Sequence, residues 1–192
     1  MHNNICIFCG ANEGKLTTAV KKIRKLVHIL VNQNSRLIYG GGIQGLMGIV
    51  ANTALELGGK VYGVIPKLLA ELETAHYGIT NLEIVDNMHI RKYRMASLAD
   101  GFIILPGGLG TLEEFFEVWT WKILGYHNKV IALLDIEGYY QKLLNFLRES
   151  AKYGFIKQEY IDELIIEQEP TLLMKRVYNY KPNNINRWAS NN

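Results

Sequence analysis

Short apolar segments alternate along this chain with longer segments whose apolar residues recur at helical spacing. The expected strands are residues 5–8, 36–39, 60–65, 82–85, 101–105, 129–134 and, as the weakest, 164–167. The expected helices are residues 18–31, 46–57, 88–99, 111–124, 139–153 and 171–178. Strands that alternate with helices form a parallel sheet covered on both faces. The pattern therefore predicts a Rossmann-like, doubly wound α/β fold.

No internal repeat and no linker interrupts this pattern. Residues 1–180 are expected to form a single nucleotide-binding α/β domain. Residues 181–192 are rich in Asn and offer little to bury, so we expect a disordered tail.

The composition narrows the class of protein further. The 192 residues are 48% apolar and 20% charged, which is near the globular average. A chain of this length can bury a core without disulfides or metals. The formal net charge of +3 does not favour nucleic acid as a partner. No apolar run approaches the roughly 20 residues that span a bilayer, and no leader pattern is visible at the start. We expect a cytoplasmic protein that binds neither membrane nor nucleic acid.

The two cysteines have the C-x-x-C spacing of redox and zinc sites. Cys6 and Cys9 lie in and just after an expected strand, on which residues three apart point to opposite faces. No second Cys pair and no paired His accompanies them. We interpret both cysteines as structural.

Glycine, proline and polar residues gather directly after five of the expected strands. These positions are all carboxyl ends, outside which an open parallel sheet forms its ligand crevice. Five loops could therefore converge on one site: residues 9–12, 40–42, 66–67, 86–89 and 106–111.

The glycine loop at residues 39–48 joins a strand to a helix. Glycine permits close approach of the backbone to a ligand, and a helix N-terminus attracts anions. The spacing is not that of a dinucleotide fingerprint, because the next acid, Glu56, lies within the following helix instead of ending the second strand. A tight turn without ligand explains the same glycines.

A second glycine loop, residues 106–114, is the stronger candidate for phosphate binding. Its glycines precede a helix whose first N–H groups are free, and Thr111 adds a hydroxyl donor. It is not a P-loop, because no Gly-Lys-Ser/Thr follows. Thr111 and Glu114 have the spacing of a capping box, in which the glutamate only binds the backbone of the helix start. The segment alone leaves a capping and a functional Glu114 open.

Two cations lie near the start of the expected helix 88–99. Arg91 and Lys92 oppose the helix dipole there, which favours a functional role, although a solvated charged face is the commoner reason for such a pair. His76, His89 and His127 lack ligand-like spacing. We therefore expect no metal and no cofactor.

The expected helix 111–124 is apolar on every side. One face should lie on the sheet, and the other needs cover from another helix or a partner chain. The apolar residues are Leu112, Phe115, Phe116, Val118, Trp119, Trp121, Ile123 and Leu124.

Several of these motifs together resemble the Lonely Guy (LOG) family of cytokinin riboside 5'-monophosphate phosphoribohydrolases. The segments that carry the resemblance are Tyr39-Gly-Gly-Gly, Gly45-Leu-Met-Gly, Gly63-Val-Ile-Pro, Met88-His-Ile-Arg-Lys, Pro106-Gly-Gly-Leu-Gly-Thr-Leu-Glu-Glu, Thr120-Trp and Gly138-Tyr-Tyr. Members of this family have been labelled possible lysine decarboxylases. We discount that label, because a pyridoxal-phosphate enzyme of the usual kind has a Schiff-base lysine and a longer chain.

The resemblance implies an enzyme that cleaves the N-ribosidic bond of AMP or an N6-modified AMP to free base and ribose 5-phosphate. It makes Arg91 and Glu114 catalytic and implies a homodimer. The residues it places around the substrate are Glu73, Lys92, Gly107, Gly108, Leu109, Gly110, Thr111, Glu113 and Thr120. A nucleotide-binding or cofactor-carrier protein of the same fold without turnover is the alternative.

Overall fold

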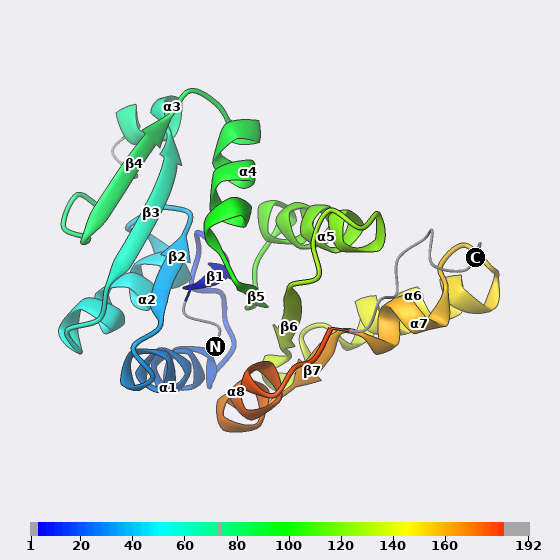
Figure 1. The fold of residues 1–192 in the computed structure, drawn as a ribbon. Helices are drawn as coiled ribbons and strands as arrows, with labels where there is room; N and C mark the ends of the chain where they lie inside the picture. The colour runs from blue at the N-terminus through cyan, green and yellow to red at the C-terminus, as the bar shows by residue number, and fades with distance from the viewer. Residues whose placement is uncertain (1–3, 73, 183–192) are drawn as a thin grey trace.

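A seven-stranded parallel sheet, in the order β4-β3-β2-β1-β5-β6-β7, runs through the computed structural model, which describes residues 4–72 and 74–182 (Figure 1). Each strand begins and ends within one residue of its expected bounds. The strands are β1 (Asn4–Phe8), β2 (Arg36–Tyr39), β3 (Val61–Pro66), β4 (Asn81–Val85), β5 (Gly101–Ile104), β6 (Val130–Leu134) and β7 (Ile165–Glu167). The predicted doubly wound α/β class is confirmed.

Helices cover both faces of the sheet, and each face has its own apolar core (Figure 1). One face carries α1 (Ala19–Asn32), α2 (Gly45–Glu56) and α8 (Pro170–Tyr178). The other carries α4 (Met88–Leu98), α5 (Leu109–Ile123), α6 (Gln141–Lys152) and α7 (Gln158–Asp162). The short elements α3 (Lys67–Glu71), η1 (Ile136–Gly138) and α7 were not expected, because a single turn is too short to show a helical period.

The cysteines separate between the two cores, as predicted. Cys6 is buried with the α4–α7 face, Cys9 is buried with the α1–α2 face, and both thiols are free. They form neither a disulfide nor half of a metal site. Among the described residues, no three His, Cys, Asp or Glu side chains come together as a possible metal site.

The sheet reverses its strand order around β1. From β1 the chain adds β2, β3 and β4 on one side and then β5, β6 and β7 on the other, so the switch point lies between β1 and β5. The loops after these two strands touch, because the Gly10 N–H donates to the carbonyl of Pro106 over 3.1 Å. Ligands of doubly wound sheets bind at such a switch point.

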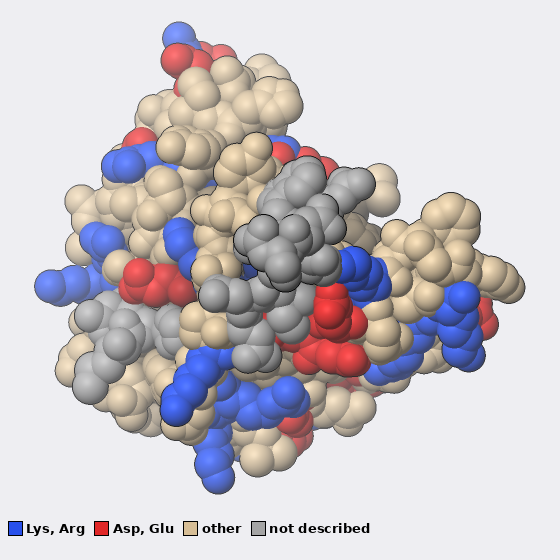
Figure 2. Space-filling model, turned by 45° about the vertical axis from the view of Figure 1, so that its right-hand side comes forward, with Lys and Arg blue, Asp and Glu red and all other residues tan. Residues whose placement is uncertain are grey.

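The molecular surface carries both signs of charge. Figure 2 shows acidic side chains beside basic ones, with the basic groups most frequent in the lower part of that face. No helix of the described residues is long and apolar enough to cross a membrane.

Candidate active site

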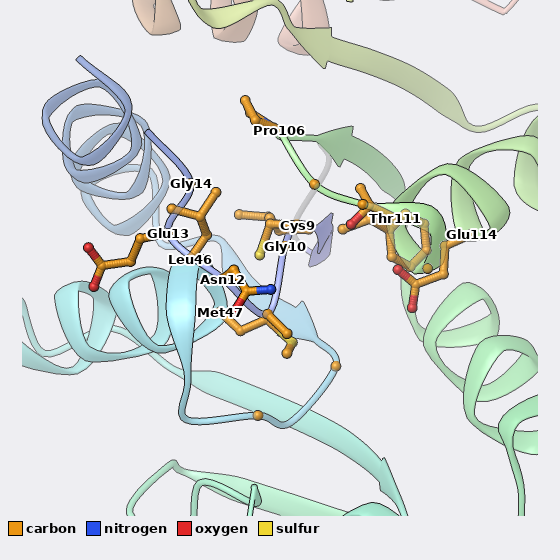
Figure 3. A pocket seen from close by; sticks show the side chains of 18 of the residues that line it. Cys9, Gly10, Asn12, Glu13, Gly14, Leu46, Met47, Pro106, Thr111 and Glu114 are labelled. Carbon is orange, nitrogen blue, oxygen red and sulfur yellow. The ribbon is translucent and has the colours of Figure 1, made fainter. Parts of the chain in front are cut away.

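A cavity of about 600 Å³ opens at the carboxyl ends of the central strands. Figure 3 shows the β1–α1 loop with Asn12 and Gly14 on one side and the start of α5 with Thr111 and Glu114 on the other. Its lining comes from the segments after four strands, since residues 9–16 follow β1, Gly40 and Gly42 follow β2, residues 106–108 and 110–111 follow β5, and Tyr139 follows β6. Ile65 contributes from the end of β3 and Arg91 from α4, and the β3–β4 connection adds Leu69 and Thr74. Three of the five predicted loops line the cavity, whereas residues 66–67 and 86–89 do not, and Ile65 and Arg91 line it nearby instead.

Arg91 is held in this cavity by backbone carbonyls. Its Nε donates to the Val64 carbonyl and its Nη2 to the Gly40 carbonyl, each over 3.1 Å, and its side chain is 9% exposed. A Cβ on Gly40 would lie 1.8 Å from Arg91 Nη2. The glycine after β2 is therefore required by the guanidinium, which neither the tight-turn nor the ligand-loop interpretation anticipated.

Glu114 faces Arg91 from α5. Its Oε1 lies 3.6 Å from Arg91 Nη1, and the Glu114 side chain is also buried. Burial raises the pKa of Glu114 to about 7, although the charge of Arg91 opposes this rise. A carboxyl that titrates near neutrality inside a cavity is typical of functional sites.

The capping-box alternative for Glu114 is wrong. The helix begins at Leu109 with Gly108 as its N-cap, two residues earlier than expected, and no side chain caps it. Thr111 and Glu114 therefore lie inside the helix, in its first and second turns. The glycines around Leu109 obscured this start in the sequence, because glycine has little helix preference.

The N-terminus of α5 forms one wall of the cavity. Gly107, Gly108, Gly110 and Thr111 all line it, and a Cβ on Gly107 would lie 2.1 Å from Thr111 Oγ1. Thr111 is buried, and its hydroxyl packs against the loop. The first N–H groups of a helix that lacks a side-chain cap are available to an anion.

Lys92 lies beside this wall but does not line the cavity. Its Nζ pairs with Glu113 and, at 3.0 Å, with Glu117. Burial alone would lower the pKa of Lys92, but the hydrogen bonds that its ammonium donates to both glutamates, together with their charges, outweigh burial and raise the pKa. The solvated-face alternative is wrong for both cations, because Arg91 and Lys92 are each 7% exposed.

Three more expected substrate residues do not line the cavity. Leu109 is 87% exposed, Glu113 is half-exposed and Thr120 is exposed on the outer side of α5. Glu73 lies outside the described residues, although its neighbour Thr74 lines the cavity.

The cavity also uses three residues to which the sequence assigned no role. Met47 follows the glycine loop on α2, Lys15 belongs to the β1–α1 loop, and Tyr139 precedes α6. Met47 and Tyr139 lie in segments that carry the family resemblance, Gly45-Leu-Met-Gly and Gly138-Tyr-Tyr. The only signal for Lys15 was its position after the carboxyl end of β1.

A buried carboxylate with a raised pKa, opposite a guanidinium in a cavity at the switch point of a parallel sheet, defines the ligand-binding or catalytic site of a doubly wound α/β protein. The profile of a family described as "Possible lysine decarboxylase" matches residues 47–177. The chain is 47% identical over 154 residues to the cytokinin riboside 5'-monophosphate phosphoribohydrolase of Rhodococcoides fascians, with 80% of this chain and 78% of that protein covered. It is 40% identical over 178 residues to the Arabidopsis thaliana enzyme LOG3, with 93% of this chain and 83% of that protein covered. The chain belongs to this family of phosphoribohydrolases, as its motifs predicted.

Solved structures of other proteins share the fold. The molybdenum cofactor binding protein of Rippkaea orientalis superposes with a TM-score of 0.67 at 16% identity over 93% of this chain and 97% of that one. The Moco carrier protein of Chlamydomonas reinhardtii superposes with a TM-score of 0.69 at 17% identity, again over 93% of this chain and 97% of that one. At such identities the likeness extends to the fold alone.

Proposed function

We propose that this protein hydrolyses the N-ribosidic bond of adenosine 5'-monophosphate or an N6-modified form, such as a cytokinin riboside 5'-monophosphate. The products are the free base and ribose 5-phosphate. The observation that carries this proposal is the buried Glu114, 3.6 Å from Arg91, in a cavity bounded by the uncapped N-terminus of α5. The family membership supports the same reaction.

Glu114 is the residue that we assign to the chemical step. Cleavage of an N-ribosidic bond passes through an oxocarbenium-like sugar, which an adjacent carboxylate stabilises. Water adds to C1' as the bond to the base breaks, and one water proton passes to Glu114. The base leaves with the bonding electron pair and takes up a proton from solvent, and Glu114 then returns its proton to solvent. Because the pKa of Glu114 is about 7, the carboxylate can accept and release that proton near neutral pH.

Arg91 has two tasks in this scheme. Its charge lies beside Glu114 and favours the ionised carboxylate, and its fixed guanidinium can bind an anionic or hydroxyl group of the substrate. The two backbone carbonyls that accept from it hold the guanidinium in place, so little side-chain entropy is lost on binding.

The 5'-phosphate is assigned to the wall formed by Gly107, Gly108, Gly110 and Thr111. A phosphate at that helix start receives backbone N–H donors and the favourable end of the helix dipole. Lys92 and Glu113 are assigned to the substrate region by resemblance, and their ion pair fixes the second turn of α5 next to this wall.

A homodimer is part of the proposal. Three apolar residues of α5 are already buried within one chain, so their burial requires no partner chain: Phe115, Val118 and Trp119. Phe116 and Trp121 are only half-buried, and a partner chain over α5 would bury them further. Leu109 and Thr120 line no part of the single-chain cavity, and a second copy over α5 would give these exposed residues a route to substrate.

Incubation of purified protein with AMP, with chromatographic detection of adenine, tests the activity. An N6-prenylated AMP in parallel identifies the preferred base. Release of free base with ribose 5-phosphate supports the enzyme, whereas tight binding of nucleotide without turnover, by wild-type protein and Glu114→Gln alike, would favour the carrier alternative.

A further inference from the structure

The Gly138-Tyr139-Tyr140 segment contributes Tyr139 to the lining of the cavity, but the proposed reaction gives this segment no task. It lies between β6 and α6, at the end of η1. Glu137 has a φ of 54° and Gly138 a φ of 73°, so two successive residues are left-handed. A non-glycine residue in this conformation is unfavourable and persists where the surroundings hold it.

Side chains from this turn bind the loops on both sides of the cavity. The Glu137 Oε1 accepts from the Thr18 N–H and hydroxyl, each at 2.7 Å, and from the Thr17 hydroxyl at 2.9 Å. These threonines end the β1–α1 loop that lines the cavity. On the opposite wall, the Tyr139 hydroxyl donates to the carbonyl of Gly107 over 2.6 Å.

Tyr139 differs from its neighbour in where it acts. Tyr139 is 45% exposed and lines the cavity, whereas Tyr140 is fully buried and its hydroxyl donates to the Leu105 carbonyl, outside the lining. The two adjacent hydroxyls therefore bind the same strand-to-helix connection, one inside the cavity and one behind it.

The hydrogen bond from Tyr139 fixes the direction of a peptide group. The described peptide bonds are all trans, and in a trans peptide the carbonyl and the next N–H point in opposite directions. An oriented Gly107 carbonyl therefore orients the N–H of Gly108, the N-cap of α5. Glycine would otherwise leave this peptide free to rotate.

We propose that Tyr139 is a positioning residue for the phosphate-binding wall: its hydroxyl holds the Gly107–Gly108 peptide so that the N–H of Gly108 is presented to the 5'-phosphate. This inference rests on the proposed function, which assigns the phosphate to the start of α5. Tyr139 acts through the peptide and takes no part in bond cleavage.

The test compares Tyr139→Phe with wild-type protein. This variant keeps the ring and its edge contact with Tyr140 and removes only the hydroxyl. We expect the Kd for ribose 5-phosphate, measured by calorimetry, to rise about 5–10-fold, as the loss of one orienting hydrogen bond implies. The KM for AMP should rise by a similar factor, with kcat within about twofold of the wild-type value.

Tyr140→Phe is the matched control, because it removes the neighbouring hydroxyl from the same connection. It should lower thermal stability and leave the affinity for ribose 5-phosphate unchanged. An equal loss of affinity for ribose 5-phosphate in both variants would mean that the loop is loosened in general, and this would overturn the proposal. Wild-type affinity for ribose 5-phosphate in Tyr139→Phe would also overturn it, as would no binding of ribose 5-phosphate by the wild-type protein. If the proposed function alone fails, the wild-type protein will bind ribose 5-phosphate but release no adenine from AMP. The ratio of the Kd for ribose 5-phosphate in Tyr139→Phe to that in the wild-type protein would still decide the role of Tyr139.

Discussion

Replacement of Glu114 by glutamine should abolish turnover and at the same time stabilise the protein above neutral pH. The carboxyl is buried, and its pKa of about 7 lies well above the ordinary value of 4.5. A raised carboxyl pKa means that the folded state binds the proton more tightly than the unfolded state. Ionisation of Glu114 therefore destabilises the fold progressively as the pH rises from about 4.5 to about 7.

The size of this effect follows from the two pKa values. A difference of about 2.5 pH units, at about 1.4 kcal/mol each, corresponds to roughly 3 kcal/mol once both states are ionised at pH 8. At pH 5 the unfolded carboxyl is only partly ionised, and the same calculation leaves about 1 kcal/mol. Glutamine has nearly the same shape and no charge, so Glu114→Gln should recover these amounts.

Urea unfolding of wild-type protein and Glu114→Gln at pH 5 and pH 8 measures the difference. Glu113→Gln is the matched control, because it removes the same charge one residue away from a half-exposed side chain that pairs with Lys92. That variant should be no more stable than wild type at either pH. In the activity assay, Glu114→Gln should lose at least ~100-fold in kcat for AMP, whereas a catalytic loss of that size is not expected from Glu113→Gln.

Two different results would refute the two roles given to Glu114, its burial cost and its part in the chemical step. Equal stability of Glu114→Gln and wild type at pH 8 would show that the carboxylate is not held against an unfavourable burial cost. Near-normal turnover by Glu114→Gln would remove Glu114 from the chemical step and leave Arg91 as the next position to change.

Four further outcomes are expected. The kcat for AMP at saturating concentration should rise with pH and level off above about 7, because the ionised form of Glu114 is the active one. A kcat that falls through this range would mean that the protonated carboxyl acts as a general acid. Gly40→Ala should lower turnover at least ~10-fold, since its Cβ would displace Arg91, and unchanged kcat would contradict this packing. AMP should be cleaved at least ~100-fold more efficiently than adenosine, equivalent to about 2.7 kcal/mol, and equal kcat/KM values would exclude the phosphate wall. Light scattering should give twice the 21.9 kDa of one chain, and a fully active monomer would refute the homodimer.

The strands could be predicted from the sequence almost to the residue. Buried parallel strands read as short continuous apolar runs, and each run here ends at a glycine, proline or polar residue. The ends of helices were harder to predict from the sequence than the ends of strands. The α5 helix starts two residues before the threonine that resembled a cap, and α6 starts two residues after Tyr139, which the sequence pattern had included in the helix.

The site was predictable only in part, because its geometry combines distant elements. The resemblance singled out Arg91 and Glu114, but their separation of 3.6 Å depends on how α4 and α5 pack on the same face of the sheet. The raised pKa of Glu114 depends on burial, which no local spacing reveals. The positioning role of Tyr139 could not be predicted from the sequence, since its hydrogen-bond partner is the backbone carbonyl of Gly107, 32 residues away.

The glycine motifs illustrate why residue type alone was ambiguous. A glycine beside a ligand cavity invites the interpretation that the ligand itself needs the space. Here a Cβ at Gly40 would collide with the Arg91 guanidinium, and a Cβ at Gly107 would collide with the Thr111 hydroxyl, before any ligand is present. Both glycines therefore make room for side chains that the proposed reaction uses. A substitution at either position should act first on the placement of those side chains, and its effect on substrate binding should follow from that displacement.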